Sequence, residues 1–245
     1  MDLDHLPLAA DAEATQTRLA PRVHRPARPE DGYRPAPGDV VVSLDIQYDG
    51  DDAHVAAHLH RHGGASLGVY AAVTPATFPY IPGYFCFREG PPLLALVHHL
   101  TTLGLPPLNV LVVDGHGLAH PRRFGVACWL GLATSLPTVG CAKSTLIHVD
   151  AEPAAERGST TAVRLDDELV GVVLRTQDGV NPLYVSPGHA IHLEPAVALV
   201  MGMDGPYRLP DPLRAADQAA RAHCRGAHGS GMTDLGAIPP VAPPW

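Results

Sequence analysis

Hydrophobic and polar positions alternate along three consecutive runs in the first third of the chain. The runs cover residues 41–49, 53–62 and 66–74, and only short turns containing Asp or Gly separate them. A period of two is typical of a β-strand with one buried face, and turns of this composition suit hairpins. The pattern therefore predicts an antiparallel meander of three strands.

After the meander the pattern changes to alternating helices and strands. Residues 109–114 form a continuous apolar run, NVLVVD, which predicts a strand buried on both faces. The other predicted elements are a helix from near Arg88 to about 100, a helix at 123–135, a strand at 138–142, a strand pair at 169–176 and 181–186, and helices at 193–202 and 212–223. Three antiparallel strands followed by alternating helices and parallel strands is the element order of an α/β protein with a ribonuclease-H-like mixed sheet flanked by helices.

The two ends of the chain differ in composition from the middle. Residues 1–38 combine a short predicted helix, at about 11–18, with a Pro- and Arg-rich connector. The main domain is expected at 39–225. The Gly- and Pro-rich segment 226–245 is predicted to be disordered, because it shows no periodicity that would suit a packed element.

Composition limits the classes of function. The 245 residues are 46% hydrophobic, which is enough for one large core, and the net charge of −8 argues against a protein that coats nucleic acid non-specifically. An enzyme that holds a few phosphates locally remains compatible, and Arg122 and Arg123 are the candidates for these contacts. The chain has no signal-peptide pattern, no membrane-length apolar run and no C-x-x-C pair. We therefore expect a reduced, cytoplasmic protein without a membrane partner.

Two aspartates follow apolar strands. Asp45 comes after VVSL and Asp114 ends NVLVVD, directly before a Gly-His-Gly turn. A carboxylate there is costly to keep charged unless a positive group lies nearby, and two on neighbouring strands would meet at one edge of the sheet. Carboxylate oxygens, water and substrate phosphate are the ligands that Mg²⁺ prefers. The alternative is that each aspartate only caps a turn or a helix.

Glu89 and Lys143 are the next candidates for the same centre. Glu89 is expected to open a helix, as a third carboxylate facing the metal or as an acidic residue favoured at a helix N-terminus. Lys143 follows an apolar strand, where its ammonium could hold a phosphate oxygen or orient the attacking water. The alternative for Lys143 is a solvated surface residue.

Histidine occurs 15 times, so a purely structural role has to be considered for each one beside a functional role. His54, His58, His60 and His62 recur at even positions of the second predicted strand. Such an array can bind zinc, but the period of two is explained more simply by the solvent face of a half-buried strand. Three other histidines in Gly- and Pro-containing loops are expected to support those loops, namely His116, His120 and His189.

Four segments resemble the successive motif blocks of the endonuclease V family. They are FPYIPGYFCFREGPPLL, LVVDGHGLAHPRRFGVA, PTVGCAKSTL and GVVLRTQDGVNPLYVSPGH, in family order and with matching spacing. The resemblance covers roughly residues 40–217. It implies a ribonuclease-H-like fold and an enzyme of DNA repair that cleaves the second phosphodiester bond 3′ to deoxyinosine. The products would carry a 3′-hydroxyl and a 5′-phosphate.

The resemblance also implies roles for individual residues. Asp45 and Asp114 match metal-binding aspartates, Glu89 matches the catalytic glutamate, and Lys143 matches the lysine near the attacking water. Mg²⁺ is the implied cofactor, with Mn²⁺ able to substitute. The segment that matches the wedge entering the duplex consists of Pro79, Tyr80, Ile81 and Pro82. The positions that match the base pocket are Gly83, Phe85, Gly125, Val126, Gly140 and Leu146.

Two residues depart from the family pattern. Trp129 stands where relatives often carry histidine, so a DNA contact there is expected to differ. Asp217 replaces a histidine of some relatives, either as a further carboxylate beside the metal or as a plain helix-surface residue. Two other functions stay open: an endoribonuclease specific for inosine in RNA, and an inactive binding module, which should have lost an acidic ligand. We expect a monomer.

Overall fold

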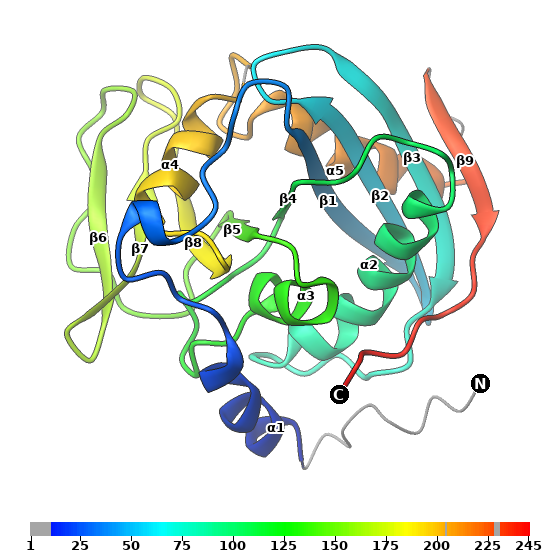
Figure 1. Cartoon of the computed structure of the whole chain (residues 1–245), viewed down its shortest axis with the longest axis horizontal. Coiled ribbons are helices and arrows are strands. Elements are labelled where there is room, and N and C mark those ends of the chain that lie inside the picture. Colours follow the sequence, from blue (N-terminus) through cyan, green and yellow to red (C-terminus); the bar gives the residue numbers. More distant parts are fainter. Residues whose placement is uncertain (1–10, 204, 228–230) are drawn as a thin grey trace.

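The computed structural model describes residues 11–203, 205–227 and 231–245. In these residues nine strands form one mixed sheet in the order β6-β7-β8-β5-β4-β1-β2-β3-β9 (Figure 1). The strands are β1 (Val40–Asp49), β2 (Asp52–Arg61), β3 (Ser66–Pro75), β4 (Val110–Val113), β5 (Thr138–Ala142), β6 (Thr160–Leu165), β7 (Glu168–Leu174), β8 (Leu183–His189) and β9 (Met232–Ala237). The α-helices are α1 (Ala12–Leu19), α2 (Phe85–Thr101), α3 (Val126–Thr134), α4 (Leu193–Met201) and α5 (Asp211–Cys224).

The predicted fold class is confirmed. β1, β2 and β3 form the antiparallel meander, and β4 and β5 extend it in parallel from β1. All four residues of β4 are buried, as the continuous apolar run predicts for a strand covered on both faces. This arrangement is the ribonuclease-H-like mixed sheet.

Helices cover both faces of the sheet (Figure 1). In β1, Val40, Val42 and Leu44 belong to the core under α1, α2 and α3, whereas Val41 belongs to the core under α4 and the start of α5. Alternate residues of β1 therefore enter two different cores, so both faces of the strand are buried, whereas the pattern predicts only one. Asp45 lies on the same side of β1 as Val41, which is the side that α5 covers.

The histidine array of β2 does not face solvent, so that prediction is wrong. His54, His58 and His60 share a face of the strand with Ala56, which packs against α5. His60 is only 7% exposed, and His54 Nδ1 lies 2.8 Å from His223 Nδ1 of α5. The period of two was correctly recognised, but a periodicity does not show that a second helix covers the polar face.

The prediction of a disordered C-terminal segment is also wrong for residues 231–245. β9 pairs in parallel with the edge of β3, and Ile238 is buried. The chain then crosses toward α3 (Figure 1). There the Trp245 ring meets Trp129 edge-on at 5.2 Å between centroids. Residues 228–230 of the same segment lie outside the described residues.

Several bounds differ from the prediction by one to three residues, and one further strand was missed. α2 begins at Phe85, one turn before Arg88, and the strand β6 was not predicted. Among the described residues, β6 is an edge strand that pairs with β7 and buries only Val163, so it lacks a strong apolar pattern.

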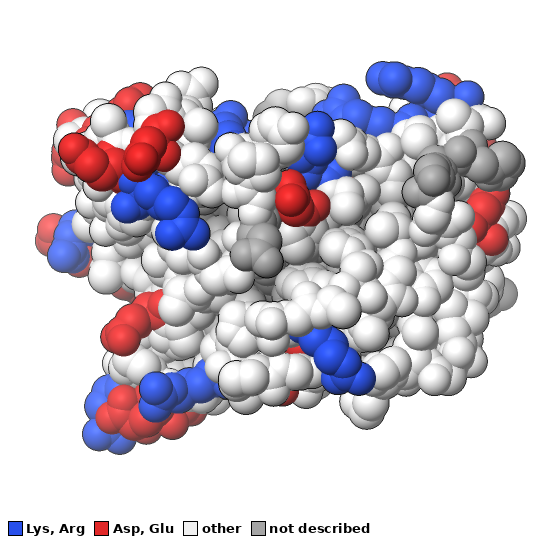
Figure 2. Space-filling view, turned by 90° about the horizontal axis from the view of Figure 1, so that it is seen from above, with Lys and Arg blue, Asp and Glu red and all other residues white. Residues whose placement is uncertain are grey.

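Charged residues make up 17% of the chain. On the face shown in Figure 2, charged side chains lie in small mixed groups around the rim, without a broad basic stripe. Among the described residues, no helix has both the length and the apolar character needed to cross a bilayer.

Candidate active site

The centre of the site lies where β4 separates from β1. The two strands pair as far as Leu44 and Val113, and the Asp114 amide makes a last bond to the Leu44 carbonyl at 3.0 Å. Beyond this point the chain turns away through Gly115, which leaves Asp45 beside an opening. β1 itself continues to Asp49, so Asp45 lies within the strand and not at its end as expected.

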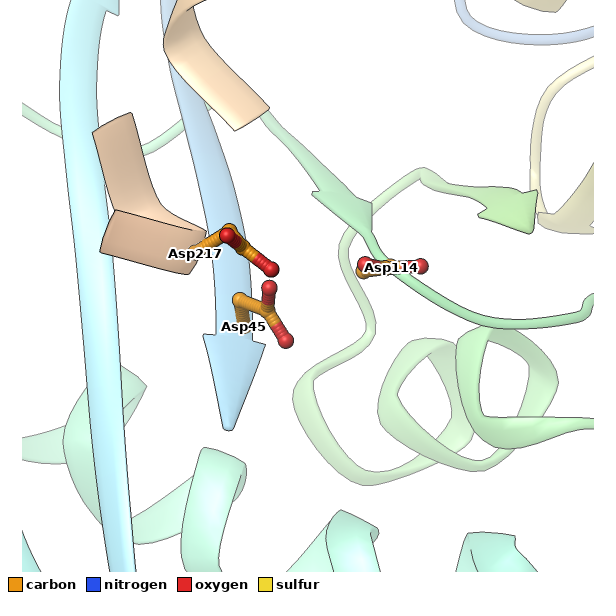
Figure 3. Close-up of side chains that lie close together, drawn as sticks. All are labelled: Asp45, Asp114 and Asp217. Atoms are coloured by element: carbon orange, nitrogen blue, oxygen red, sulfur yellow. The ribbon is translucent and has the colours of Figure 1, made fainter. Parts of the chain in front are cut away.

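Three carboxylates converge at this opening. One oxygen each from Asp45, Asp114 and Asp217 lie within 4.8 Å of one another. Figure 3 shows Asp45 on β1 and Asp217 on α5 pointing toward each other, with Asp114 facing them from the end of β4. Asp217 is thus not a plain helix-surface residue, since its side chain is only 15% exposed and belongs to the acidic cluster.

We call Asp45, Asp114 and Asp217 the acidic cluster. The positive charge around it is too small to keep all three carboxylates ionised at neutral pH. Burial, followed by the charge of Asp114, raises the pKa of Asp45 to about 8, and burial also raises the pKa of Asp114. For Asp217, burial acts upward, but hydrogen bonds from Arg221 and Lys143 bring the pKa down to about 2. Asp45 Oδ1 accepts a bond from the Ile46 amide at 2.7 Å, whereas Oδ2 is buried without a hydrogen-bond partner.

These observations fit a divalent cation. The donors are all carboxylate oxygens, the set that Mg²⁺ and Mn²⁺ prefer over softer ligands. A buried carboxylate oxygen without a partner is costly, and a cation would remove this cost. The residues present therefore suit the metal that the sequence implies.

Lys143 lies beside the acidic cluster, in the segment that follows β5. Its ammonium is 2.5 Å from Asp114 Oδ2 and 3.1 Å from Asp217 Oδ1, while the side chain stays 38% exposed. Burial lowers the pKa of Lys143, but Asp114 outweighs this effect and the net shift is upward. The lysine is therefore charged and can be reached from solvent.

Glu89 approaches the centre from the opposite face of the sheet. It is the fifth residue of α2 and does not open the helix, contrary to the expectation. Its carboxylate is not one of the three clustered groups, but it lines a cavity together with Asp114 and Lys143. Burial and the charge of Asp114 raise the pKa of Glu89 to about 8.

This cavity, the base cavity, adjoins the acidic cluster and has a volume of about 210 Å³. It is smaller than pockets for drug-sized ligands, which measure about 300–1,000 Å³. Five of the six residues expected in the base pocket line it, namely Gly83, Phe85, Gly125, Val126 and Leu146.

Gly140 is the exception. It lies behind the cavity, in β5, where an added Cβ would stand 2.5 Å from the Gly117 amide and 2.6 Å from the Gly115 carbonyl. Gly140 therefore lets β5 pack directly against the D-G-H-G loop, and it is not among the residues that line the cavity.

The predicted wedge, residues 79–82, forms an exposed loop beside the base cavity. Tyr80 is 69% exposed, and its ring lies 5.0 Å from that of Phe85. Ile81 is half-buried against the core, whereas Pro79 and Pro82 are exposed.

Both ends of the wedge loop are held by buried donors. At its start, Arg88 donates to the Phe78 carbonyl at 2.6 Å. At its end, the Gly83 carbonyl accepts from Arg122 at 2.8 Å, His120 at 3.0 Å and Gln16 at 3.2 Å. Sequence reasoning missed Arg88 and Gln16: Arg88 adjoins Glu89 in the F-R-E motif, but no signal in α1 marks Gln16.

The other predicted residues lie outside the acidic cluster. His116 Nδ1 is buried without a hydrogen-bond partner, and burial lowers the pKa of this histidine to about 4. His189 Nδ1 accepts from the His24 amide at 3.2 Å. Arg123 forms ion pairs with Glu168 at 2.5 Å and Asp166 at 3.2 Å. Trp129 is fully buried, so it offers no surface to DNA, in line with the expectation that a contact at this position differs from that of relatives with histidine.

Comparison with known proteins agrees with these motifs and this geometry. The family model of endonuclease V matches residues 23–218. An endonuclease V of Roseiflexus castenholzii is 46% identical over 181 residues, which cover 74% of this chain and 80% of that protein. The chain belongs to the endonuclease V family. The resemblance predicted from the sequence motifs is thereby confirmed, and the protein is a nuclease.

Solved endonuclease V structures share the fold. That of Streptomyces avermitilis superposes with a TM-score of 0.79 at 36% identity, covering 91% of this chain and 96% of its own. Endonuclease V of Ciona intestinalis, in complex with a 24mer DNA containing an inosine followed by a ribo-adenosine, gives a TM-score of 0.76 at 23% identity. It covers 89% of this chain and 98% of its own. At this lower identity the likeness concerns the fold.

Proposed function

We propose that this endonuclease V is a metal-dependent enzyme of DNA repair that recognises deoxyinosine. In this proposal it hydrolyses the second phosphodiester bond 3′ to the lesion and leaves a 3′-hydroxyl and a 5′-phosphate. The observation that carries the proposal is the position of the acidic cluster beside the base cavity, with Asp114, Glu89 and Lys143 on the boundary between them. The Ciona complex makes inosine the first base to test.

The acidic cluster would hold Mg²⁺, with Mn²⁺ as a substitute, through Asp45, Asp114 and Asp217. Such an ion neutralises the charge that develops on the phosphoryl and leaving oxygens during hydrolysis. Asp45 and Asp114 are fixed by the paired backbone of β1 and β4, and Asp217 by α5, so the ligands are positioned before substrate binds.

Lys143 and Glu89 would act on the substrate side. The exposed ammonium of Lys143 can bind a non-bridging phosphate oxygen and move away from Asp217 as the phosphate arrives. Glu89 lies within the base cavity, where its carboxylate can orient the attacking water and accept its proton. The family motifs imply a catalytic role for Glu89 and place Lys143 near the attacking water.

The base cavity would hold the extruded hypoxanthine, and Tyr80 would fill the gap left in the duplex. Unstacking a base costs a few kcal/mol, and least where the base is weakly paired. Gly83 and Gly125 let the backbone approach the base closely. Arg122 would contribute to phosphate binding from its place beside Gly83, and Arg123 after exchange of its ion pairs.

The test offers purified protein with Mg²⁺ an end-labelled inosine in duplex DNA, single-stranded DNA and RNA of one sequence. We expect the duplex DNA to be cut once, one nucleotide beyond the lesion on its 3′ side, and the matched adenosine duplex to stay intact. Preferential cutting of the RNA would replace this proposal with the endoribonuclease. Absence of cutting on all three substrates, with intact fold, would favour the inactive binding module.

A further inference from the structure

A second hollow, of about 920 Å³, lies next to the wedge loop but outside the catalytic centre. We name it the arginine hollow; its lining is Thr17, Ala20, Pro21, Arg22, Val23, His24, Arg25, Arg122 and Arg123. Four of these nine residues are arginines and none is acidic. The whole chain has a net charge of −8 and only 17 lysines and arginines, so this concentration of positive charge is a local exception.

The fold builds the arginine hollow from two distant segments. One wall is the end of α1 and the Pro/Arg-rich connector, which a bond from the Ala190 amide to the His24 carbonyl at 2.9 Å holds in place. The buried side chains of Leu19 and Val23 anchor the same segment in the core. The other wall is the loop after β4 that carries Arg122 and Arg123. The arginines therefore converge from segments with fixed backbones.

Arg122 connects the arginine hollow with the base cavity. Its guanidinium lines the hollow and also donates to the Gly83 carbonyl, which belongs to the wall of the base cavity. A nucleic-acid strand whose base enters the cavity would thus have neighbouring backbone phosphates within the range of this hollow. Phosphates are the ligand that guanidinium groups bind best, through paired N–H donors.

One carboxylate, that of Glu168 at the start of β7, pairs with two arginines of the hollow. Glu168 pairs with Arg25 at 3.2 Å and with Arg123 at 2.5 Å, and Glu168 is 42% exposed. Exposed ion pairs contribute only about 0–1 kcal/mol, so a phosphate can exchange with such a partner at little cost. Arg22 is exposed at the rim and Arg25 is 31% exposed, so both can be reached from solvent.

We propose that the arginine hollow binds backbone phosphates of duplex DNA beside the lesion, with Arg22 and Arg25 as phosphate ligands. The N-terminal connector is then part of the DNA-binding surface. This inference rests on the proposed function for the identity of the partner. Phosphate contacts carry no sequence information, so the contribution of these arginines should be equal for damaged and undamaged duplex.

The experiment compares Arg22→Ala/Arg25→Ala with Arg28→Ala/Arg34→Ala. Both double variants remove two charges from the same connector, and in each pair one arginine holds an ion pair, Arg25 with Glu168 and Arg28 with Asp31. Binding to inosine duplex and to the matched undamaged duplex is measured in Ca²⁺ over a range of salt concentrations.

Arg22→Ala/Arg25→Ala should weaken binding to both duplexes by about tenfold or more, as expected for lost charge-assisted contacts. It should also reduce the slope of log K against log salt by about 1.8, or 0.9 for each phosphate contact. Arg28→Ala/Arg34→Ala should keep the parental slope. The inference would be overturned if the two double variants had equal salt slopes. This holds whether both slopes equal that of the parent or both are smaller.

A third variant guards against misfolding. Glu168→Gln removes the competing carboxylate, so it should tighten duplex binding by about two- to fivefold, a gain that a damaged fold would not produce. A parent that binds inosine and undamaged duplex equally would contradict the proposed lesion recognition. Even then, the salt slopes of the two double variants on undamaged duplex would show whether the arginine hollow binds phosphates.

Discussion

The buried guanidinium of Arg88 donates to the Phe78 carbonyl at 2.6 Å, directly before the wedge loop. The same group donates to the Gly50 carbonyl at 3.1 Å and lies over the Tyr48 ring, so it joins the β1–β2 turn to the loop. Glu89 is the next residue of α2. A rigid helix therefore sets the position of the loop and of Glu89 together, as the proposed wedge and catalytic roles would require.

The first prediction concerns Tyr80. Its ring is 69% exposed although the loop around it is anchored, so Tyr80→Ala should leave the fold intact. If the ring stacks in place of the extruded base, its loss should cost about 1–3 kcal/mol of binding, or about 5- to 150-fold in affinity. Affinity for inosine duplex in Ca²⁺ measures this effect. Tyr80→Phe is the matched control and should bind as the parent does; parental affinity of Tyr80→Ala would refute the wedge assignment.

The second prediction concerns the acidic cluster. Asp45→Asn keeps the acceptor for the Ile46 amide but removes a buried charge, so nicking with Mg²⁺ should fall at least about 100-fold. In EDTA at pH 7 the same variant should melt no lower than the parent, because the raised pKa of Asp45 already keeps most of this carboxyl neutral when no metal is bound. Added Mg²⁺ should raise the Tm of the parent but not of Asp45→Asn.

Asp150→Asn is the control for this experiment, since Asp150 is 96% exposed and lies outside the acidic cluster. It should keep both the activity and the rise in Tm. An Asp45→Asn variant that nicks like the parent, or that still gains stability from Mg²⁺, would remove Asp45 from the metal site.

The parts of the fold that follow from local pattern were predictable. The meander and the buried strand β4 are visible as periods and apolar runs, and Asp45 and Asp114 stand out because charge interrupts those runs. Asp217 is different: it lies on a polar helix face, and only the packing of α5 over β1 brings it to the acidic cluster.

The elements that were missed depend on partners far away in the sequence. β9 is short, rich in small residues, and ordered through its pairing with β3. Trp129 is fully buried, and one of its ring partners, Trp245, lies more than 100 positions later. The composition of a segment describes that segment alone. It cannot show that the segment pairs with the free edge of a sheet elsewhere in the fold, as β9 does with β3.

The third prediction concerns this C-terminal contact. Trp245→Ala removes an edge-to-face aromatic pair and part of the apolar cover over Trp129. The free energy of unfolding should fall by about 1–3 kcal/mol, measured by urea denaturation. Pro244→Ala, at an exposed neighbouring position, should have no such effect. Equal stability of Trp245→Ala and the parent would mean that the terminal segment does not contribute to the core.

The last prediction concerns His120, whose two ring nitrogens both have partners in the neutral form. Nε2–H donates to the Gly83 carbonyl at 3.0 Å, and Nδ1 accepts from the Arg122 amide at 3.2 Å. Protonation of Nδ1 would destroy the second bond. Burial, together with the charge of Arg122, lowers the pKa of His120 to about 4 in the folded protein.

The folded pKa lies below the unfolded value of about 6.5, so the unfolded chain binds more protons between these two values. Stability is therefore present above about pH 6.5 and is lost as the pH falls toward 4, by roughly 2 kcal/mol at pH 5 for this one residue. Glutamine can keep both hydrogen bonds without titrating, so His120→Gln should lose less stability between pH 7 and pH 5 in urea unfolding. His116 has a similar pKa shift, so part of the slope should remain. His148→Gln, at an 87% exposed position, is the control and should follow the parent. If His120→Gln shows the parental pH dependence, His120 is not a source of the acid sensitivity, and the neutral bridge between Gly83 and Arg122 is not what stabilises this end of the wedge loop.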